Sequence, residues 1–165
     1  MESTTLSALD QYLSFNIDSE VYALDITRVR EILEFTTVTK VPRMPAFMRG
    51  VINLRGAVVP VIDMRARFGL PEAPVDKSTC IIITDVEIEG TRLVLGAVAD
   101  SVQEVFQFED KHLERLPRMG GLLEANFLKG MGTHDGGFVQ VLELDRLFSA
   151  EEAGAINNST TAPVA

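Results

Sequence analysis

The stretch FMRGVINLRGAVVPVIDMRARF, residues 47–68, decides how this chain folds. Two apolar runs, Val51–Leu54 and Ala57–Ile62, are separated only by Arg55 and Gly56. Glycine readily adopts the left-handed backbone conformation that a tight turn requires. Two apolar runs joined by such a turn are typical of a β-hairpin. The sequence therefore predicts a hairpin with Arg55 at its tip.

A short helical turn is predicted on each side of this hairpin. Before it, Pro45–Arg49 should form one turn that ends at Gly50. After it, Asp63 should cap a short helix over Met64–Phe68, because an aspartate side chain accepts hydrogen bonds from the first free N–H groups.

The whole unit recurs 80 residues later. Residues 127–148 read FLKGMGTHDGGFVQVLELDRLF, and an ungapped offset of 80 pairs Gly50 with Gly130, Gly56 with Gly136 and Phe68 with Phe148. Upstream of each copy, RVREI at residues 28–32 matches SVQEV at residues 101–105. Recurrence of this kind predicts two tandem copies of one small β-rich module.

Composition excludes several classes of function. The formal net charge of −9 opposes binding to a phosphate backbone, which requires a positive surface. No apolar run approaches the roughly 18 residues that span a bilayer, and the N-terminus lacks a basic region followed by an apolar one. We expect a cytoplasmic protein.

Alternating and β-branched segments predict strands separated by turns. The one long helical pattern is 26–35, where apolar residues at 26, 29, 32 and 33 share a face.

A proline-containing polar linker at 70–77 suggests that the chain divides there into two subdomains. The expected organisation is a flexible segment 1–10, a first β-barrel subdomain 11–70, a second 71–148, and a disordered tail 149–165, with exchange of strands between the barrels left open. The expected strands are 12–17, 21–24, 36–41, 51–54, 57–62, 79–86, 91–99, 102–108, 126–133 and 138–142.

Catalytic and cofactor motifs are missing from the sequence. His112 and His134 have no other ligand-type residues at metal-binding spacing, and His134-Asp135 is more typical of a hairpin turn than of a metal site. Cys80, the only cysteine, lies in an apolar run and is predicted to be a buried core thiol. We expect no enzyme activity, no cofactor and no metal.

Arg55 is the strongest candidate for a binding residue. It could simply be a solvated turn residue, yet an arginine on a rigid hairpin also makes a good anchor for a partner. An acidic chain of two β modules without catalytic groups favours a binding module.

Three segments resemble the CheW family of chemotaxis coupling proteins. They are LDITRVREI (24–32), VPRMPAFMRGVINLRGAVVPVIDMRARFG (41–69), and FLKGMG with VQVLELDRLF in the second copy. The resemblance covers roughly residues 10–148. It implies a mainly β fold of two five-stranded SH3-like β-barrels with a few short helices, in agreement with the repeat.

The resemblance also implies two partners. One is the histidine kinase CheA, which would be bound through its regulatory domain. The other is the cytoplasmic tip of methyl-accepting chemotaxis receptors. Such an adaptor is recruited to membrane-associated receptor arrays and scaffolds them. Helix-in-groove docking is the expected mode, because the receptor tip is a helical hairpin. The residues carried over as partner-binding are Val29 and Glu31, on the receptor side, and Gly50, Arg55, Gly56 and Val58, which are not divided between the partners.

Two other functions remain open at this stage. One is coupling in a related chemosensory pathway, for example pilus motility with its own kinase. The other is a small-molecule-binding β-barrel, which would need an interior pocket with convergent polar groups.

Overall fold

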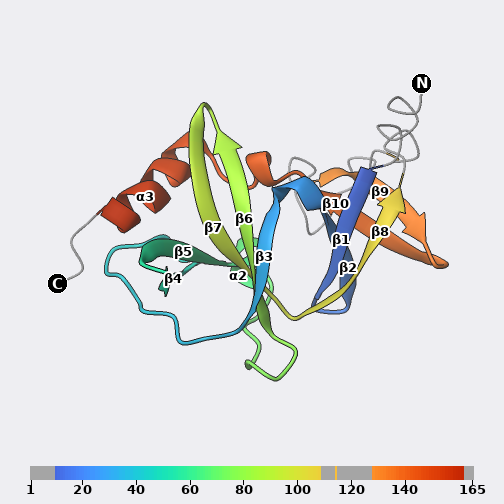
Figure 1. Ribbon diagram of the computed structural model, residues 1–165, viewed down its shortest axis with the longest axis horizontal. Helices are drawn as coiled ribbons and strands as arrows, with labels where there is room; N and C mark the ends of the chain where they lie inside the picture. The colour runs from blue at the N-terminus through green and yellow to red at the C-terminus, as the bar shows by residue number, and fades with distance from the viewer. Residues whose placement is uncertain (1–9, 109–113, 115–127, 162–165) are drawn as a thin grey trace.

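The computed structural model of the chain describes residues 10–108, 114 and 128–161, and Figure 1 shows two β-barrels side by side. The predicted fold class is confirmed, because the described residues form two five-stranded SH3-like barrels with a few short helices. The strands are β1 Asp10–Ile17, β2 Glu20–Asp25, β3 Val29–Glu34, β4 Met48–Leu54, β5 Ala57–Asp63, β6 Cys80–Ile88, β7 Thr91–Ala99, β8 Ser101–Phe108, β9 Leu128–His134 and β10 Gly137–Leu142. The helices are η1 Ile26–Arg28, α2 Met64–Arg67, η4 Leu144–Arg146 and α3 Ala150–Thr161.

Each barrel draws strands from both halves of the chain. Barrel A has the order β8-β1-β2-β10-β9, and barrel B has the order β3-β6-β7-β5-β4. The two halves meet through parallel pairs, β10 with β2 and β5 with β7. The predicted boundary near residue 70, between 11–70 and 71–148, therefore does not separate the sheets. Strands are exchanged reciprocally between the two halves of the chain.

The repeated unit has the same structure in both barrels. The hairpins β4–β5 and β9–β10 turn through residues with positive φ, Arg55 at 50° and Asp135 at 52°, each followed by a glycine. Asp63 caps α2 as predicted, accepting hydrogen bonds from the backbone N–H of Arg65 (3.0 Å) and Ala66 (3.3 Å). The second copy ends in the corresponding η4 turn.

Among the described residues, three apolar clusters hold the barrels together. One fills barrel A, one fills barrel B, and the largest lies between the barrels and belongs to both. In this shared core, the Phe47 and Phe148 rings lie 5.1 Å apart, and the Tyr22 and Phe68 rings lie 5.2 Å apart. Cys80 is buried within the shared core, as predicted. Burial, and to a lesser extent the nearby Asp100 charge, raises the pKa of its thiol to about 11.

The predicted helix over 26–35 is wrong. Asp25 caps only the 3-10 turn η1, and the chain then enters strand β3. The apolar side chains that suggested a helix, such as Ile32, are paired instead with β6, where Ile32 lies opposite Ile82. Partner strands distant in sequence override local periodicity here.

Two neighbouring predictions also differ from the structure. The segment 36–41 is not a strand and makes only an isolated bridge, from Thr39 to Val51. The expected helical turn over 45–49 is shorter, because β4 begins at Met48, whose N–H donates to the Pro45 carbonyl.

The expected disorder of the tail is wrong for residues 150–161, which form α3. A capping box starts this helix: Ser149 N–H donates to Glu152 Oε1 (2.9 Å), and Glu152 N–H donates to Ser149 Oγ (3.1 Å). Ala153 and Ile156 then pack into the shared core. The end of the tail and residues 1–9 of the predicted flexible segment 1–10 lie outside the described residues, whereas Asp10 is the first residue of β1. Among the helices of the described part, none is long and apolar enough to cross a membrane.

Candidate partner-binding site

A groove of about 370 Å³ opens at one end of barrel B. Strand β3, the β4–β5 hairpin, β6, β7 and helix α3 all contribute to its walls. The residues that line it are Arg30, Glu31, Leu54, Arg55, Ala57, Val58, Val59, Pro60, Ile83, Arg92, Leu93, Val94 and Asn157.

The floor of the groove is the apolar interior of the barrel. Val59 and Ile83 belong to the buried cluster of barrel B, and Leu54 and Val94 pack against it while remaining partly accessible. Val58 continues this apolar surface outwards and is 36% exposed. Exposed apolar surface next to a concave site favours contact with another molecule.

An ion pair between Glu31 and Arg55 lies at the rim of the groove. The Arg55 guanidinium donates to both carboxylate oxygens, from Nη1 to Oε1 (3.3 Å) and from Nη2 to Oε2. These hydrogen bonds lower the pKa of Glu31 and raise the pKa of Arg55. Glu31 is on the first strand of the sheet and Arg55 follows the last one, so the pair bridges the two edges that close barrel B.

The hairpin turn fixes the position of Arg55. Asn53 Oδ1 accepts a hydrogen bond from the N–H of Gly56 (2.9 Å), and both turn residues have positive φ. The Arg55 side chain is 71% exposed, so its charge remains accessible even though one partner is already in contact.

Two further arginines carry charge around the groove. Arg30 pairs with Asp85 (2.8 Å), and Arg92 pairs with Glu87 (3.1 Å). The local surface is therefore dense in arginine, on a chain whose overall charge is −9. Arginine side chains of this kind are frequent in protein interfaces.

The structure brings together only part of the predicted binding set. Glu31, Arg55 and Val58 line the groove, and Gly56 forms the turn beside Arg55. Val29 and Gly50 do not line it. Val29 pairs with Thr84 and packs against the shared core. Gly50 lies against the segment before β4, where an added Cβ would be 2.2 Å from the Thr39 carbonyl oxygen.

Sequence reasoning missed several residues of the groove. Arg30, Ile83 and Arg92 come from three different strands, and Asn157 comes from a helix that was not predicted. The capping box at Ser149 and Glu152 was a usable signal for that helix. No sequence pattern indicates that the three strands converge.

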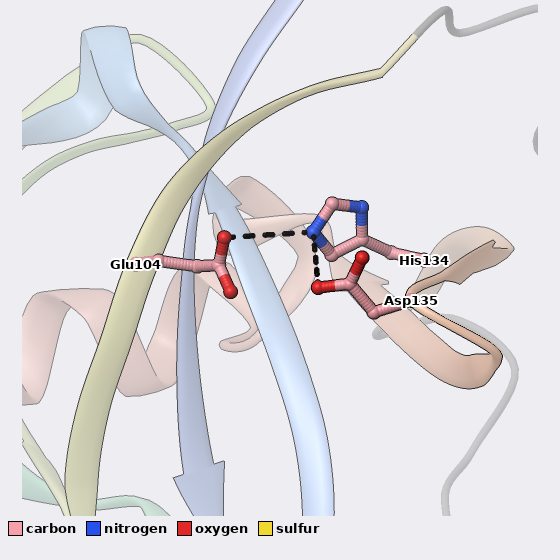
Figure 2. A group of neighbouring side chains, drawn as sticks. All are labelled: Glu104, His134 and Asp135. Carbon is pink, nitrogen blue, oxygen red and sulfur yellow. Dashed lines mark ion pairs between the residues drawn. The ribbon is translucent and has the colours of Figure 1, made fainter.

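A second charged cluster lies at the corresponding end of barrel A. It consists of Glu104, His134 and Asp135, which Figure 2 shows with their side chains directed toward one another. These are the ligand types that bind metal ions.

Known proteins resemble this chain over most of its length. The family model described as the CheW-like domain matches residues 11–152. The probable chemotaxis protein CheW of Rhizobium etli is 35% identical over 145 residues, which are 88% of this chain and 91% of that protein. Protein PilI of Pseudomonas aeruginosa is 23% identical over 120 residues, covering 72% of this chain and 65% of PilI.

A solved structure agrees with these matches. The crystal structure of the scaffolding protein TtCheW from Thermoanaerobacter tengcongensis has a TM-score of 0.76 and 32% sequence identity to this chain. The match covers 87% of this chain and 90% of that one. With the family model spanning both barrels, these similarities lead to one conclusion: the chain belongs to the CheW-like domain family.

Proposed function

We propose that this chain is a non-catalytic adaptor that couples methyl-accepting chemotaxis receptors to the histidine kinase CheA. The observation that carries the proposal is membership of the CheW-like family across both barrels, residues 11–152. The adaptor would be cytoplasmic and recruited to membrane-associated receptor arrays. Its contribution is geometric, since a rigid body that binds two proteins holds them in a fixed relative orientation.

The groove of barrel B supports the proposal with a surface of suitable shape and chemistry. An amphipathic helix docks by placing apolar side chains into a groove and polar ones at its rim. The floor formed by Val59 and Ile83 would take the apolar face, and the Glu31–Arg55 pair at the rim would select the orientation.

The four predicted residues in or beside the groove have distinct roles in this proposal. Val58 adds apolar contact area, while Arg55 and Glu31 offer hydrogen bonds, and Gly56 allows the turn that presents Arg55. Val29 and Gly50 would act indirectly, by fixing the strands that carry the others.

Binding and kinase output together test this function. Purified CheA and receptor fragments are mixed with the wild-type chain and with the variants Arg55→Ala and Val58→Ser. We expect each variant to bind at least one partner roughly ten-fold more weakly, as truncation of an interface anchor does. Circular dichroism should show both variants folded, because both positions are exposed.

Val75→Ser provides a matched control. Val75 is 43% exposed, comparable to Val58, but it does not line the groove. This variant should bind and couple like the wild type. The absence of binding to both partners by the wild-type chain would refute the function, and equal losses in Val58→Ser and Val75→Ser would refute the location of the site.

The similarity to Protein PilI supports a second candidate, coupling in a related chemosensory pathway such as pilus motility. The same fold and the same groove would serve a different kinase. Offering the chain equal amounts of a chemotaxis kinase and of the kinase from the alternative pathway distinguishes the candidates by which one it binds more tightly.

A further inference from the structure

The mouth of barrel A is built like the mouth of barrel B but carries different charges. In barrel B, a glutamate on the first strand of the sheet meets an arginine at the hairpin tip. In barrel A, the same two places hold a glutamate and an aspartate, with a histidine between them. The corresponding sets are Glu31, Leu54 and Arg55 in barrel B, and Glu104, His134 and Asp135 in barrel A.

At the hairpin tip of barrel A, an aspartate therefore occupies the position that the Arg55 guanidinium has in barrel B. Glu31 meets the guanidinium of Arg55, whereas Glu104 and Asp135 both face the imidazole of His134 (Figure 2). Two carboxylates directed at one point repel each other unless a positive charge lies between them. The cluster therefore has the composition of a cation site.

The imidazole is placed as a ligand would be. Its Nε2 atom is buried and has no hydrogen-bond partner among the described residues. Nε2 lies 3.6 Å from Glu104 Oε1 and 3.5 Å from Asp135 Oδ2, which is too long for a good hydrogen bond. The His134 ring is stacked on Phe106 with centroids 4.2 Å apart, so packing fixes its orientation.

The two separations from Nε2 match the donor spacing around a small tetrahedral ion, and all three ligand atoms lie within 4.8 Å of one another. Zn²⁺ binds imidazole nitrogen and carboxylate oxygen at about 2.0–2.2 Å, which places neighbouring donors about 3.4 Å apart in a tetrahedron. One nitrogen and two carboxylate oxygens are a donor set that Zn²⁺ accepts and that Mg²⁺, which prefers oxygen alone, does not favour. The Glu104 and Asp135 side chains are 51% and 77% exposed, which leaves a path for the ion and for a water as fourth ligand.

We propose that Glu104, His134 and Asp135 form a Zn²⁺ site at the mouth of barrel A. The site joins β8 to the β9–β10 hairpin, which are the first and last parts of the sheet order β8-β1-β2-β10-β9. A bound ion thus closes barrel A across the same two edges that the Glu31–Arg55 pair joins in barrel B. Zn²⁺ binding stabilises the fold, and it does so independently of the proposed partners.

Calorimetric titration of ZnCl₂ into the metal-free, full-length chain tests the site, with no polyhistidine tag present. The wild type should bind one Zn²⁺ ion. His134→Gln should weaken binding roughly 100-fold or more and Glu104→Gln roughly ten-fold or more, because each removes a ligand. His112→Gln is the matched control, since it removes the only other histidine, and it should bind as the wild type does.

Thermal unfolding gives a second readout that does not depend on heats of binding. Zn²⁺ should raise the Tm of the wild type and of His112→Gln, but not that of His134→Gln. If His134→Gln is unfolded by circular dichroism, Asp135→Asn replaces it, because that side chain is exposed in the turn. The proposal is overturned if the wild type does not bind Zn²⁺ stoichiometrically, or if the ligand variants bind as tightly as His112→Gln.

Discussion

Gly50 lies where strand β4 passes closest to the preceding segment of the chain. Its φ is +148°, and a Cβ there would approach the Thr39 carbonyl oxygen to 2.2 Å. The bridge between Thr39 and Val51 depends on this close approach, with hydrogen bonds of 2.8 and 2.9 Å in both directions. Gly50 thus belongs to the scaffold that supports the β4–β5 hairpin rather than to the surface that the hairpin presents.

We expect Gly50→Ala to lower the free energy of unfolding by about 2–3 kcal/mol, because it adds backbone strain and a clash with backbone atoms. Gly154→Ala is the control, since an added Cβ meets nothing within 4 Å and the residue is inside helix α3. That change should stabilise by about 0.5–1 kcal/mol. Urea unfolding measures both, and equal effects at the two glycines would contradict this explanation.

Arg55 and Asp135 show how one backbone supports two kinds of chemistry. Both occupy the first turn position with nearly the same φ, and both face a glutamate across the barrel mouth. The scaffold is therefore common, and single side chains decide whether the mouth holds an ion pair or a cluster suited to a cation.

Among the elements, α3 connects the shared core to the groove. Ile156 is fully buried on this helix, and the next residue, Asn157, lines the groove. The helix is therefore an integral part of the fold and contributes to the candidate site.

Ile156→Ala should reduce the free energy of unfolding by about 2–4 kcal/mol, through lost burial and the cavity that remains. Ala155→Ser, at the neighbouring exposed position, should change it by about 0.5 kcal/mol or less. Urea unfolding followed by far-UV circular dichroism, which reports on helix content, measures the free energy of unfolding of both variants. If Ile156→Ala were as stable as the control, α3 would not be anchored in the core.

The corner between β7 and β8 is tied to two other elements by Asp100. Its carboxylate accepts hydrogen bonds from Nε (3.1 Å) and Nη2 (2.7 Å) of Arg65 in α2. It also accepts one from the backbone N–H of Asp18 in the β1–β2 turn (2.7 Å). Partial burial alone would raise the pKa of Asp100, but these hydrogen bonds and the Arg65 charge lower it below its usual value of 3.8.

This lowered pKa predicts a dependence of stability on pH. The folded protein favours the ionised carboxylate, so the contribution to stability is complete above the usual pKa of the unfolded chain and is lost as pH falls through the lower pKa of the folded protein. Unfolding free energies measured from pH 6 down to pH 2 should therefore fall more steeply for the wild type than for Asp100→Asn. Parallel pH profiles would show that Asp100 makes no such contribution.

At the scale of the whole molecule, the reciprocal exchange of strands makes the two halves dependent on each other. Strand β2 needs β10 from the second half, and β5 needs β7. The largest apolar cluster also takes residues from both halves.

Splitting the chain within the linker at 70–77 tests this dependence. Fragments 1–74 and 75–165, expressed separately, should each lack a stable fold, because each has unpaired strand edges and half of the shared core. Mixed together, they should regain the β-sheet circular dichroism spectrum and elute as one complex. A dispersed NMR spectrum from fragment 1–74 alone would contradict the prediction.

Local patterns in the sequence were sufficient for the hairpins, the caps and the repeat. Turn residues such as Arg55-Gly56 and caps such as Asp63 act over a few bonds, so their effect is visible without knowledge of the rest of the fold. The family and its two-barrel architecture were also recognisable, because the repeated unit and its signature lie in continuous stretches.

Other features depended on contacts between residues distant in sequence. Residues 29–34 form a strand rather than a helix because β6 is available as a partner, and the halves exchange strands because their edges pair in parallel. The same reason applies to both barrel mouths: Glu31 meets Arg55, and Glu104 meets His134, only after the first and last strands of each sheet are brought together. The sequence alone determined which modules form, whereas the tertiary structure decided which side chains meet, because closing a barrel joins residues that no local pattern relates.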